Sequence, residues 1–262
     1  MADHWMFSDA QSLVEVSELH VRRGGQEVVR NVSFSISAGE TVGLIGPNGS
    51  GKSSTIGGIL GLLPVDRGAI RMGNTSFTAS EERPVEFKRR IAYIPEQPLY
   101  YSDLTLAEHI DWKMRLWQQA GGEEQERRLE QLIDHFQLGP HLNKFAHQCS
   151  KGTLQKLMVV SAFLFPFDFL IIDEPFIGLD VVAIRMLKQY IQQARGAGAT
   201  ILLSTHVLDS AEKMCDRFVF LADGEVFAAG TANDLAADHG LAFTNLEDLF
   251  VDLLLARSGG VL

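Results

Sequence analysis

Gly46-Pro-Asn-Gly-Ser-Gly51-Lys52-Ser53 is the stretch that decides the fold, because it matches G-x-x-x-x-G-K-[ST] and directly follows the apolar run Thr41–Ile45. In loops of this kind the glycines let consecutive backbone N–H groups curl around an anion, and the following helix presents its positive N-terminal end. Lys52 is expected to reach the β and γ phosphates of a nucleotide, and Ser53 to offer a hydroxyl to Mg²⁺. The predicted nucleotide-binding residues of the loop are Gly46, Pro47, Asn48, Gly49, Ser50, Gly51, Lys52, Ser53 and Ser54.

Two adjacent carboxylates, Asp173 and Glu174, end a second apolar run, Leu170–Ile172. Side chains of neighbouring residues diverge at a strand end, so Asp173 can face a Mg²⁺ ion while Glu174 turns toward the γ phosphate and its attacking water. Acids also follow strands in ordinary turns, which is the structural alternative. Together with the phosphate loop, the pair predicts nucleotide hydrolysis, with Glu174 positioning or deprotonating the water.

The strand pattern places this chemistry in an α/β fold. Thr41–Ile45, Phe169–Ile172 and Thr200–Ser204 are short, unbroken apolar runs, which is typical of parallel strands buried on both faces. Residues 13–36 alternate around Gly24-Gly25, and Asp223-Gly224 joins two apolar runs, so both regions predict antiparallel hairpins. The predicted fold is a P-loop NTPase core with a mostly parallel sheet and an antiparallel β subdomain.

A helical insertion is predicted in the middle of the chain. Thr105-Leu-Ala-Glu108 has capping-box spacing ahead of an apolar stripe, and helical spacing continues from Leu129 to Phe136 after the Gly121-Gly122 break. We expect one domain over residues 1–262, with core and antiparallel parts at about 12–95 and 160–231. The helical subdomain is expected at about 96–160 and a helical tail at about 232–262, with a helix at Asn245–Leu255.

These motifs resemble the ABC (ATP-binding cassette) ATPase family, since the carboxylates are followed by Pro175-Phe-Ile-Gly178-Leu179-Asp180 and then by Ser204-Thr205-His206. The resemblance runs from about Leu13 to Thr231. The residues of its motifs, Tyr93–Glu96 and Asp173–Asp180, are most similar to those of the ATPases of Ecs-type and ABC-2-type bacterial exporters. It implies that Asp180 lies in a loop crossing a dimer interface and that His206 contacts the γ phosphate. It also implies ATP and Mg²⁺ as cofactors.

The family's signature, Leu-Ser-Gly-Gly-Gln, corresponds here to Cys149-Ser150-Lys151-Gly152-Thr153. Ser150 can still cap a helix and Gly152 still permits close backbone approach, so the resemblance implies that this helix end binds ATP held by the other subunit. Lys151 replaces a glycine. Its charge either attracts phosphate or faces solvent, and the solvated alternative is preferred.

Two further positions depart from the family pattern. The usual Mg²⁺-sensing glutamine falls on Glu96, with Gln97 next to it; either residue can sense the nucleotide, and Glu96 is preferred as a metal ligand beside Ser53 and Asp173. The adenine-stacking position falls on Arg23, whose guanidinium plane can stack on a base or simply face solvent from a turn.

Composition limits the choice of partners. The formal net charge is −10, the pI is about 5.3 and no long Lys/Arg run occurs, which argues against nucleic acid. The 2 cysteines lack ligand spacing, which favours a reducing cytosol, and no stretch has the roughly 20 apolar residues of a spanning helix.

The sequence therefore predicts an ATP-hydrolysing motor subunit of an ABC transporter, with Glu174, His206 and Lys52 as catalytic residues. The family resemblance implies that two copies close around two MgATP and drive a separate integral membrane permease, an exporter, at the cytoplasmic face of the cell membrane. Pro98–Tyr101 is a candidate docking loop, with ordinary packing as its alternative. A soluble ABC ATPase that is not coupled to transport is the alternative function.

Overall fold

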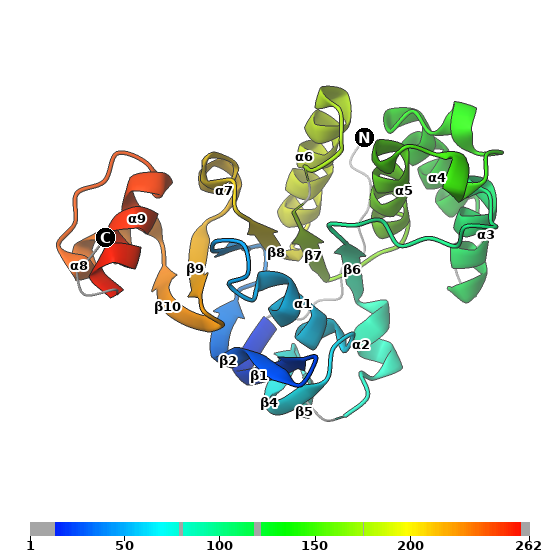
Figure 1. Ribbon diagram of the computed structural model, residues 1–262. Coiled ribbons are helices and arrows are strands. Elements are labelled where there is room, and N and C mark those ends of the chain that lie inside the picture. Colours follow the sequence, from blue (N-terminus) through cyan, green and yellow to red (C-terminus); the bar gives the residue numbers. More distant parts are fainter. Residues whose placement is uncertain (1–13, 79–80, 118–121, 175, 258–262) are drawn as a thin grey trace.

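The computed structural model describes residues 14–78, 81–117, 122–174 and 176–257 (Figure 1). In these residues the strands form two sheets. The smaller is antiparallel, in the order β2-β1-β4-β5, and the larger has the order β10-β9-β3-β8-β7-β6. Gly121 and Pro175, which figured in the sequence prediction, lie outside the described residues.

The strands of the smaller sheet are β1 (Val14–Arg23), β2 (Gln26–Ile36), β4 (Val65–Met72) and β5 (Thr75–Thr78). Those of the larger sheet are β3 (Thr41–Ile45), β6 (Ile91–Ile94), β7 (Phe169–Asp173), β8 (Thr200–Thr205), β9 (Arg217–Ala222) and β10 (Glu225–Gly230). All pairs in the larger sheet are parallel except β9 with β10, which form the predicted hairpin across Asp223-Gly224.

The helices in the described residues are α1 (Lys52–Leu60), α2 (Val85–Arg89), α3 (Leu106–Leu116), α4 (Glu123–His135), α5 (Lys151–Phe163), α6 (Val181–Gly196), α7 (Leu208–Met214), α8 (Ala232–His239) and α9 (Leu246–Arg257). None of them is long and apolar enough to cross a lipid bilayer. Helix α1 lies between the two sheets, whereas α5 and α6 lie on the other face of the larger sheet (Figure 1).

Alternate residues of the central strands enter two different cores. Phe169, Ile171 and Leu202 pack toward α1 and the smaller sheet. Leu170 and Ile172 pack on the opposite face, with the helices α3 to α6. Burial on both faces explains why these strands are continuous apolar runs, and the predicted α/β fold class is confirmed.

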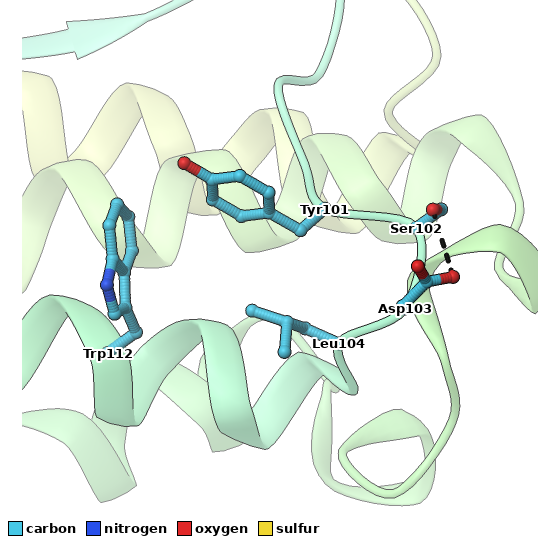
Figure 2. Close-up of a pocket in the computed structure, with 5 residues that line it drawn as sticks. All are labelled: Tyr101, Ser102, Asp103, Leu104 and Trp112. Atoms are coloured by element: carbon cyan, nitrogen blue, oxygen red, sulfur yellow. Dashed lines mark hydrogen bonds between the residues drawn. The ribbon is translucent and has the colours of Figure 1, made fainter.

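The helical region between β6 and β7 starts as its sequence predicts. The Thr105 hydroxyl accepts a hydrogen bond from the Glu108 N–H, and the Glu108 carboxylate accepts one from the Thr105 N–H. An open hollow of about 400 Å³ lies beside this cap (Figure 2). It is lined by Tyr101, Ser102, Asp103 and Leu104, which precede the cap, and by Trp112 of α3. The rings of Tyr101 and Trp112 meet edge to face, with centroids 5.4 Å apart.

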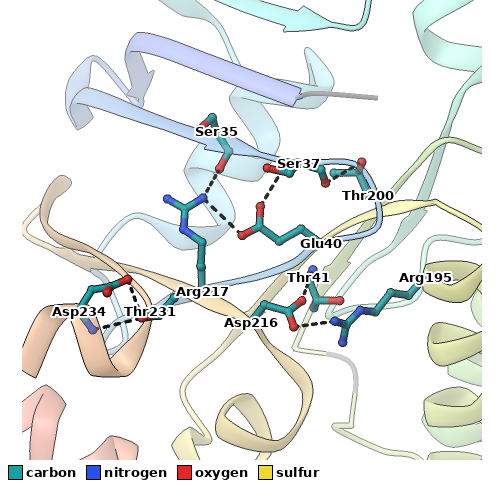
Figure 3. Close-up of polar contacts among 10 residues, drawn as sticks. All are labelled: Ser35, Ser37, Glu40, Thr41, Arg195, Thr200, Asp216, Arg217, Thr231 and Asp234. Atoms are coloured by element: carbon teal, nitrogen blue, oxygen red, sulfur yellow. Dashed lines mark hydrogen bonds and ion pairs between the residues drawn. The ribbon is translucent and has the colours of Figure 1, made fainter. Parts of the chain in front are cut away.

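Polar contacts fix the start of β3, the strand that leads into the phosphate loop (Figure 3). The Asp216 carboxylate accepts hydrogen bonds from the Thr41 N–H at 2.9 Å and from Arg195 at 2.6 Å. Arg217 reaches the Ser35 carbonyl, and its guanidinium lies 3.4 Å from the Glu40 carboxylate. The strand is therefore held at its start by segments that come much later in the chain.

Candidate active site

The phosphate loop joins β3 to α1 and leaves the N-terminal end of α1 open. Gly51 is the N-cap, in the left-handed conformation with φ 105°, and no side chain of the described residues caps the helix. The first N–H groups of a helix have no partner within the helix, and the helix dipole makes this end positive. The backbone N–H groups of the loop and of the helix start can therefore bind an anion, as the sequence predicts.

Lys52 lies folded onto this loop. Its ammonium donates to the carbonyls of Gly46, at 2.7 Å, and Pro47, at 3.2 Å. Burial lowers the pKa of Lys52, while the negative charges of Glu174, Asp173 and Glu96 raise it in part. A bound phosphate would add a further negative charge beside this buried cation and so favour its protonated form.

Asp173 ends strand β7 in a buried position. The hydroxyl of Ser204 on β8 donates to its carboxylate, and burial raises the pKa of Asp173 although hydrogen bonds from Ser204 and Ser53 lower it in part. Ser53, at the start of α1, is thus near enough to Asp173 to influence its pKa. Ser204 was not predicted as a site residue. The parallel pairing of Asp173 with Ser204 places it there, and single-sequence patterns do not reveal that register.

Glu174 is held from two sides. His206 Nδ1 lies 2.7 Å from one carboxylate oxygen, and the Thr205 hydroxyl donates to the other at 3.2 Å. The Glu174 backbone has φ 49°, which is unusual for a residue with a side chain, and its N–H donates to the Ser204 carbonyl. The glutamate is 7 % exposed, so its orientation is fixed by β8 and the residue that follows it.

Oxygen ligands suited to Mg²⁺ converge here. Mg²⁺ in nucleotide sites is held by one or two carboxylates together with phosphate oxygens and waters, so it does not need an all-protein cage. In keeping with this, the described residues contain no cluster of three or more His, Cys, Asp or Glu that could hold a metal. Ser53 and Asp173 fit such an ion. Glu96 is near enough for its charge to act on Lys52 and on Tyr93, whose pKa is raised chiefly by burial and further by Asp173 and Glu96. Gln97, the alternative to Glu96, is exposed.

The signature residues lie at the N-terminal end of α5, apart from α1 (Figure 1). Ser150 caps this helix, because its hydroxyl accepts a hydrogen bond from the Thr153 N–H at 3.1 Å. A Cβ at Gly152 would lie 2.5 Å from the Gly178 carbonyl oxygen, so only glycine lets the helix approach the segment before Asp180 so closely. Ser150 and Lys151 are both exposed.

Two residues beyond the signature tie it to other parts of the site, and neither was predicted. Lys156 forms an ion pair with Asp180 at 2.6 Å, and the pKa of Asp180 is lowered by this hydrogen bond and by the Ala183 N–H. Gln155 is fully buried and donates to the Pro95 carbonyl, next to Glu96. Both residues lie one helical turn after Gly152, and this spacing is the sequence signal that could have identified them.

Arg23 ends β1 at the tip of the β1–β2 hairpin, where it is exposed. The structure brings together Lys52, Ser53, Asp173, Glu174 and His206, with Glu96 beside them. It leaves Arg23 and the signature pair, Ser150 and Gly152, outside this cluster.

Comparison with known proteins gives a consistent result. Residues 29–177 match the family model described as "ABC transporter". The chain is 39% identical over 248 residues to the ABC-type transporter ATP-binding protein EcsA of Bacillus subtilis, covering 95% of this chain and 99% of that protein.

Two further similarities extend this comparison. The chain is 30% identical to the lipopolysaccharide export system ATP-binding protein LptB of Acidithiobacillus ferridurans, covering 85% of this chain and 92% of that protein. A solved structure described as the ATP binding subunit of an ABC transporter superposes with a TM-score of 0.82 at 41% identity, covering 92% of this chain and 99% of the other.

Proposed function

The chain belongs to the ABC transporter ATP-binding family, and from that premise we propose that it is an ATP-hydrolysing motor that drives a separate membrane permease. The observation that carries the hydrolytic part is the contact between Glu174 and His206, 2.7 Å apart at the carboxyl ends of β7 and β8. It places a buried carboxylate, oriented from two sides, at the same sheet edge as the phosphate loop.

Each residue has a distinct part in the proposed reaction. Lys52 and the backbone N–H groups of the loop bind the phosphates, and Glu174 orients or deprotonates the attacking water. His206 keeps the Glu174 carboxylate in place and would also contact the γ phosphate. Mg²⁺, held by Ser53 and Asp173 with Glu96 beside them, would neutralise charge that develops on the phosphates.

We further infer that the site is completed by a second copy of the chain. Ser150 and Gly152 offer the open end of α5, yet they do not join the cluster around Lys52 in their own chain. Two copies facing head to tail would place each signature against the ATP of the other, with Asp180 at the interface. ATP would then hold the pair together and hydrolysis would release it.

The proposed contact with the permease is the hollow formed by Tyr101 and Trp112 (Figure 2). Leu99, Tyr100, Tyr101 and Trp112 are exposed by between 44% and 63%, and exposed aromatic residues are enriched at interfaces. The apolar rings suit a short helix of a membrane protein. An export function is favoured by relatives such as LptB, whose name describes an export system. Such a subunit would act at the cytoplasmic face of the membrane.

Hydrolysis is tested by Glu174→Gln, which keeps the shape of the side chain and removes its charge. We expect turnover of ATP to fall on the order of 10²- to 10⁴-fold, while the dissociation constant for ATP changes little. Glu130→Gln, at an exposed position of α4, serves as the control and should turn over ATP like the wild type. Equal rates for Glu174→Gln and the wild type would reject the assignment.

Coupling to a permease is tested separately, by co-purification from detergent-solubilised membranes of cells that express the tagged chain. A multi-span membrane protein should accompany the wild type and be lost with Tyr101→Glu, while ATP binding persists. Recovery of the chain without any membrane protein would favour the alternative of an ATPase not coupled to transport.

A further inference from the structure

The turn between β9 and β10, Asp223-Gly224, lies directly against the phosphate loop. The Gly224 N–H donates to the Ser50 carbonyl at 2.9 Å, and this bond joins the turn to the middle of the loop. Ser50 is only 2 % exposed, so the contact is sealed from solvent. This backbone bond therefore ties the loop to the turn in the interior of the protein.

The glycines of the loop permit this contact as well as phosphate binding. A Cβ on Gly46 would clash with the Leu221 carbonyl oxygen, at the end of β9. A Cβ on Gly51 would lie 3.0 Å from the Val28 carbonyl oxygen on β2, 3.3 Å from the Leu221 side chain and 3.4 Å from Gly224 Cα. The segment from Leu221 to Gly224 therefore forms a close-fitting support for the loop, and little slack remains between the two.

The Asp223-Gly224 turn is itself held by contacts on two sides. On one side the Arg30 N–H donates to the Gly224 carbonyl at 2.7 Å, and the Arg30 guanidinium bonds the Asp223 carbonyl. On the other side Arg257, at the end of α9, lies 3.6 Å from the Asp223 carboxylate and 3.5 Å from that of Glu225. The support thus connects the phosphate loop to β2 and to the last described helix.

We propose that the Asp223-Gly224 turn is a positioning element that sets the affinity of the phosphate loop for nucleoside triphosphate. This inference rests on the proposed function, because it concerns the same site. The loop binds phosphate through backbone N–H groups, whose direction depends on small rotations around Ser50 and Gly51. A displaced turn removes the bond that holds those rotations, so the N–H groups no longer converge.

Gly224→Ala tests the proposal most directly. Gly224 has φ +80°, and a Cβ there would lie 2.6 Å from the Val28 carbonyl oxygen on β2, so the turn must shift and its bond to Ser50 is disturbed. We expect the dissociation constant for a slowly hydrolysed ATP analogue to rise about tenfold, the equivalent of about 1.4 kcal/mol. Isothermal titration calorimetry on the purified full-length chain measures it.

Gly73→Ala is the matched control. Gly73 also has a left-handed backbone, with φ +57°, in the turn between β4 and β5, and a Cβ there would have only the Arg90 guanidinium within 4 Å, at 3.8 Å or more. Both variants carry the same kind of backbone strain, and both should lower the thermal unfolding midpoint of the nucleotide-free protein. Only Gly224→Ala should weaken binding. Equal affinities in the two variants would overturn the proposal.

Arg257→Gln keeps the proposal testable if Gly224→Ala fails to fold. It removes the tie from α9 and should raise the dissociation constant about two- to threefold, because exposed ion pairs are individually weak. Arg115→Gln, which breaks an exposed pair with Asp111 on α3, should leave affinity unchanged. An Arg257→Gln protein with wild-type affinity contradicts the inference. If the wild type itself fails to bind the analogue, the proposed function fails instead.

Discussion

The two ends of the proposed site differ in how far one chain completes them. At the phosphate-loop end, Lys52, Asp173 and Glu174 are 7 %, 3 % and 7 % exposed and are bonded to neighbouring strands or to the loop itself. At the signature end, Ser150 and Lys151 are exposed at the start of a helix. The difference favours our proposal that one copy suffices to bind nucleotide, whereas turnover requires a pair.

The largest effect is expected when two inactive variants, one damaged at the phosphate-loop end and one at the signature end, are mixed. Lys52→Met damages only the phosphate-loop end, and Gly152→Ala damages only the signature end, since its Cβ would lie 2.5 Å from the Gly178 carbonyl oxygen. Each alone should lose turnover on the order of a hundredfold. In an equal mixture half of the pairs are mixed and carry one intact site, so about a quarter of the wild-type rate should return.

The matched control for this experiment combines Lys52→Met with Glu174→Gln. Both changes affect the same end, so no intact site can form in any pair and the mixture should stay inactive. ATP turnover of freshly mixed, purified proteins measures both cases. If the first mixture also stays inactive, the signature does not act on the other copy.

Arg23→Ala sharpens the comparison at the binding end. If the guanidinium stacks on adenine, its loss should weaken ATP binding about tenfold, since base stacking contributes about 1–3 kcal/mol. Binding of inorganic triphosphate, which has no base, should not change, and Arg23→Trp should restore ATP affinity. Calorimetric titration of both ligands distinguishes the two cases. If Arg23 faces solvent, Arg23→Ala should change neither the affinity for ATP nor that for triphosphate.

The C-terminal end of α5, the helix that carries the signature, offers a third test. Lys113 of α3 donates a hydrogen bond to the Ser161 carbonyl at this end, at 2.5 Å. Burial lowers the pKa of Lys113 from 10.5 to about 8. Between about pH 8 and 10.5 the unfolded chain thus holds a proton that the folded chain has released, so this residue makes stability rise with pH.

Replacing this lysine removes the effect. Relative to the wild type, the free energy of unfolding of Lys113→Met should fall by up to about 1.4 kcal/mol per pH unit within that window. Urea unfolding at several pH values measures it. Lys144→Met, at an exposed position, serves as the control for replacing a lysine by methionine. A constant difference for Lys113→Met would contradict the predicted titration.

The smallest effect is expected for Lys151→Ala. Lys151 is exposed, and exposed charges are screened by water and salt, so turnover should stay within about threefold of the wild type. A fall of more than tenfold in the rate of hydrolysis, with ATP affinity unchanged, would instead assign the ammonium to the phosphate of the facing copy.

Sequence patterns predicted the parts of the fold that depend on local chemistry. The strand Thr41–Ile45, the cap at Thr105 and the hairpin at Asp223-Gly224 are present as predicted, and the fold class and the family are confirmed. These features are encoded by short runs of residues, whose apolar spacing or turn chemistry decides their structure without distant partners.

Contacts between distant segments could not be predicted in this way. Nothing in the Asp223-Gly224 dipeptide shows that it packs against Ser50, and nothing around Lys156 shows that it pairs with Asp180. Both contacts depend on how the elements are arranged in three dimensions. The roles of the site residues, the domain boundaries and the choice of Glu96 over Gln97 stay predictions.

The backbone of Glu174 has a consequence for how this protein can change over generations. A buried carboxylate in a left-handed conformation costs stability, on the order of 1 kcal/mol for the backbone alone. Asparagine tolerates that conformation better. Selection for heat resistance alone would therefore enrich variants that have lost the glutamate, and only a continuing need for turnover would keep it in place.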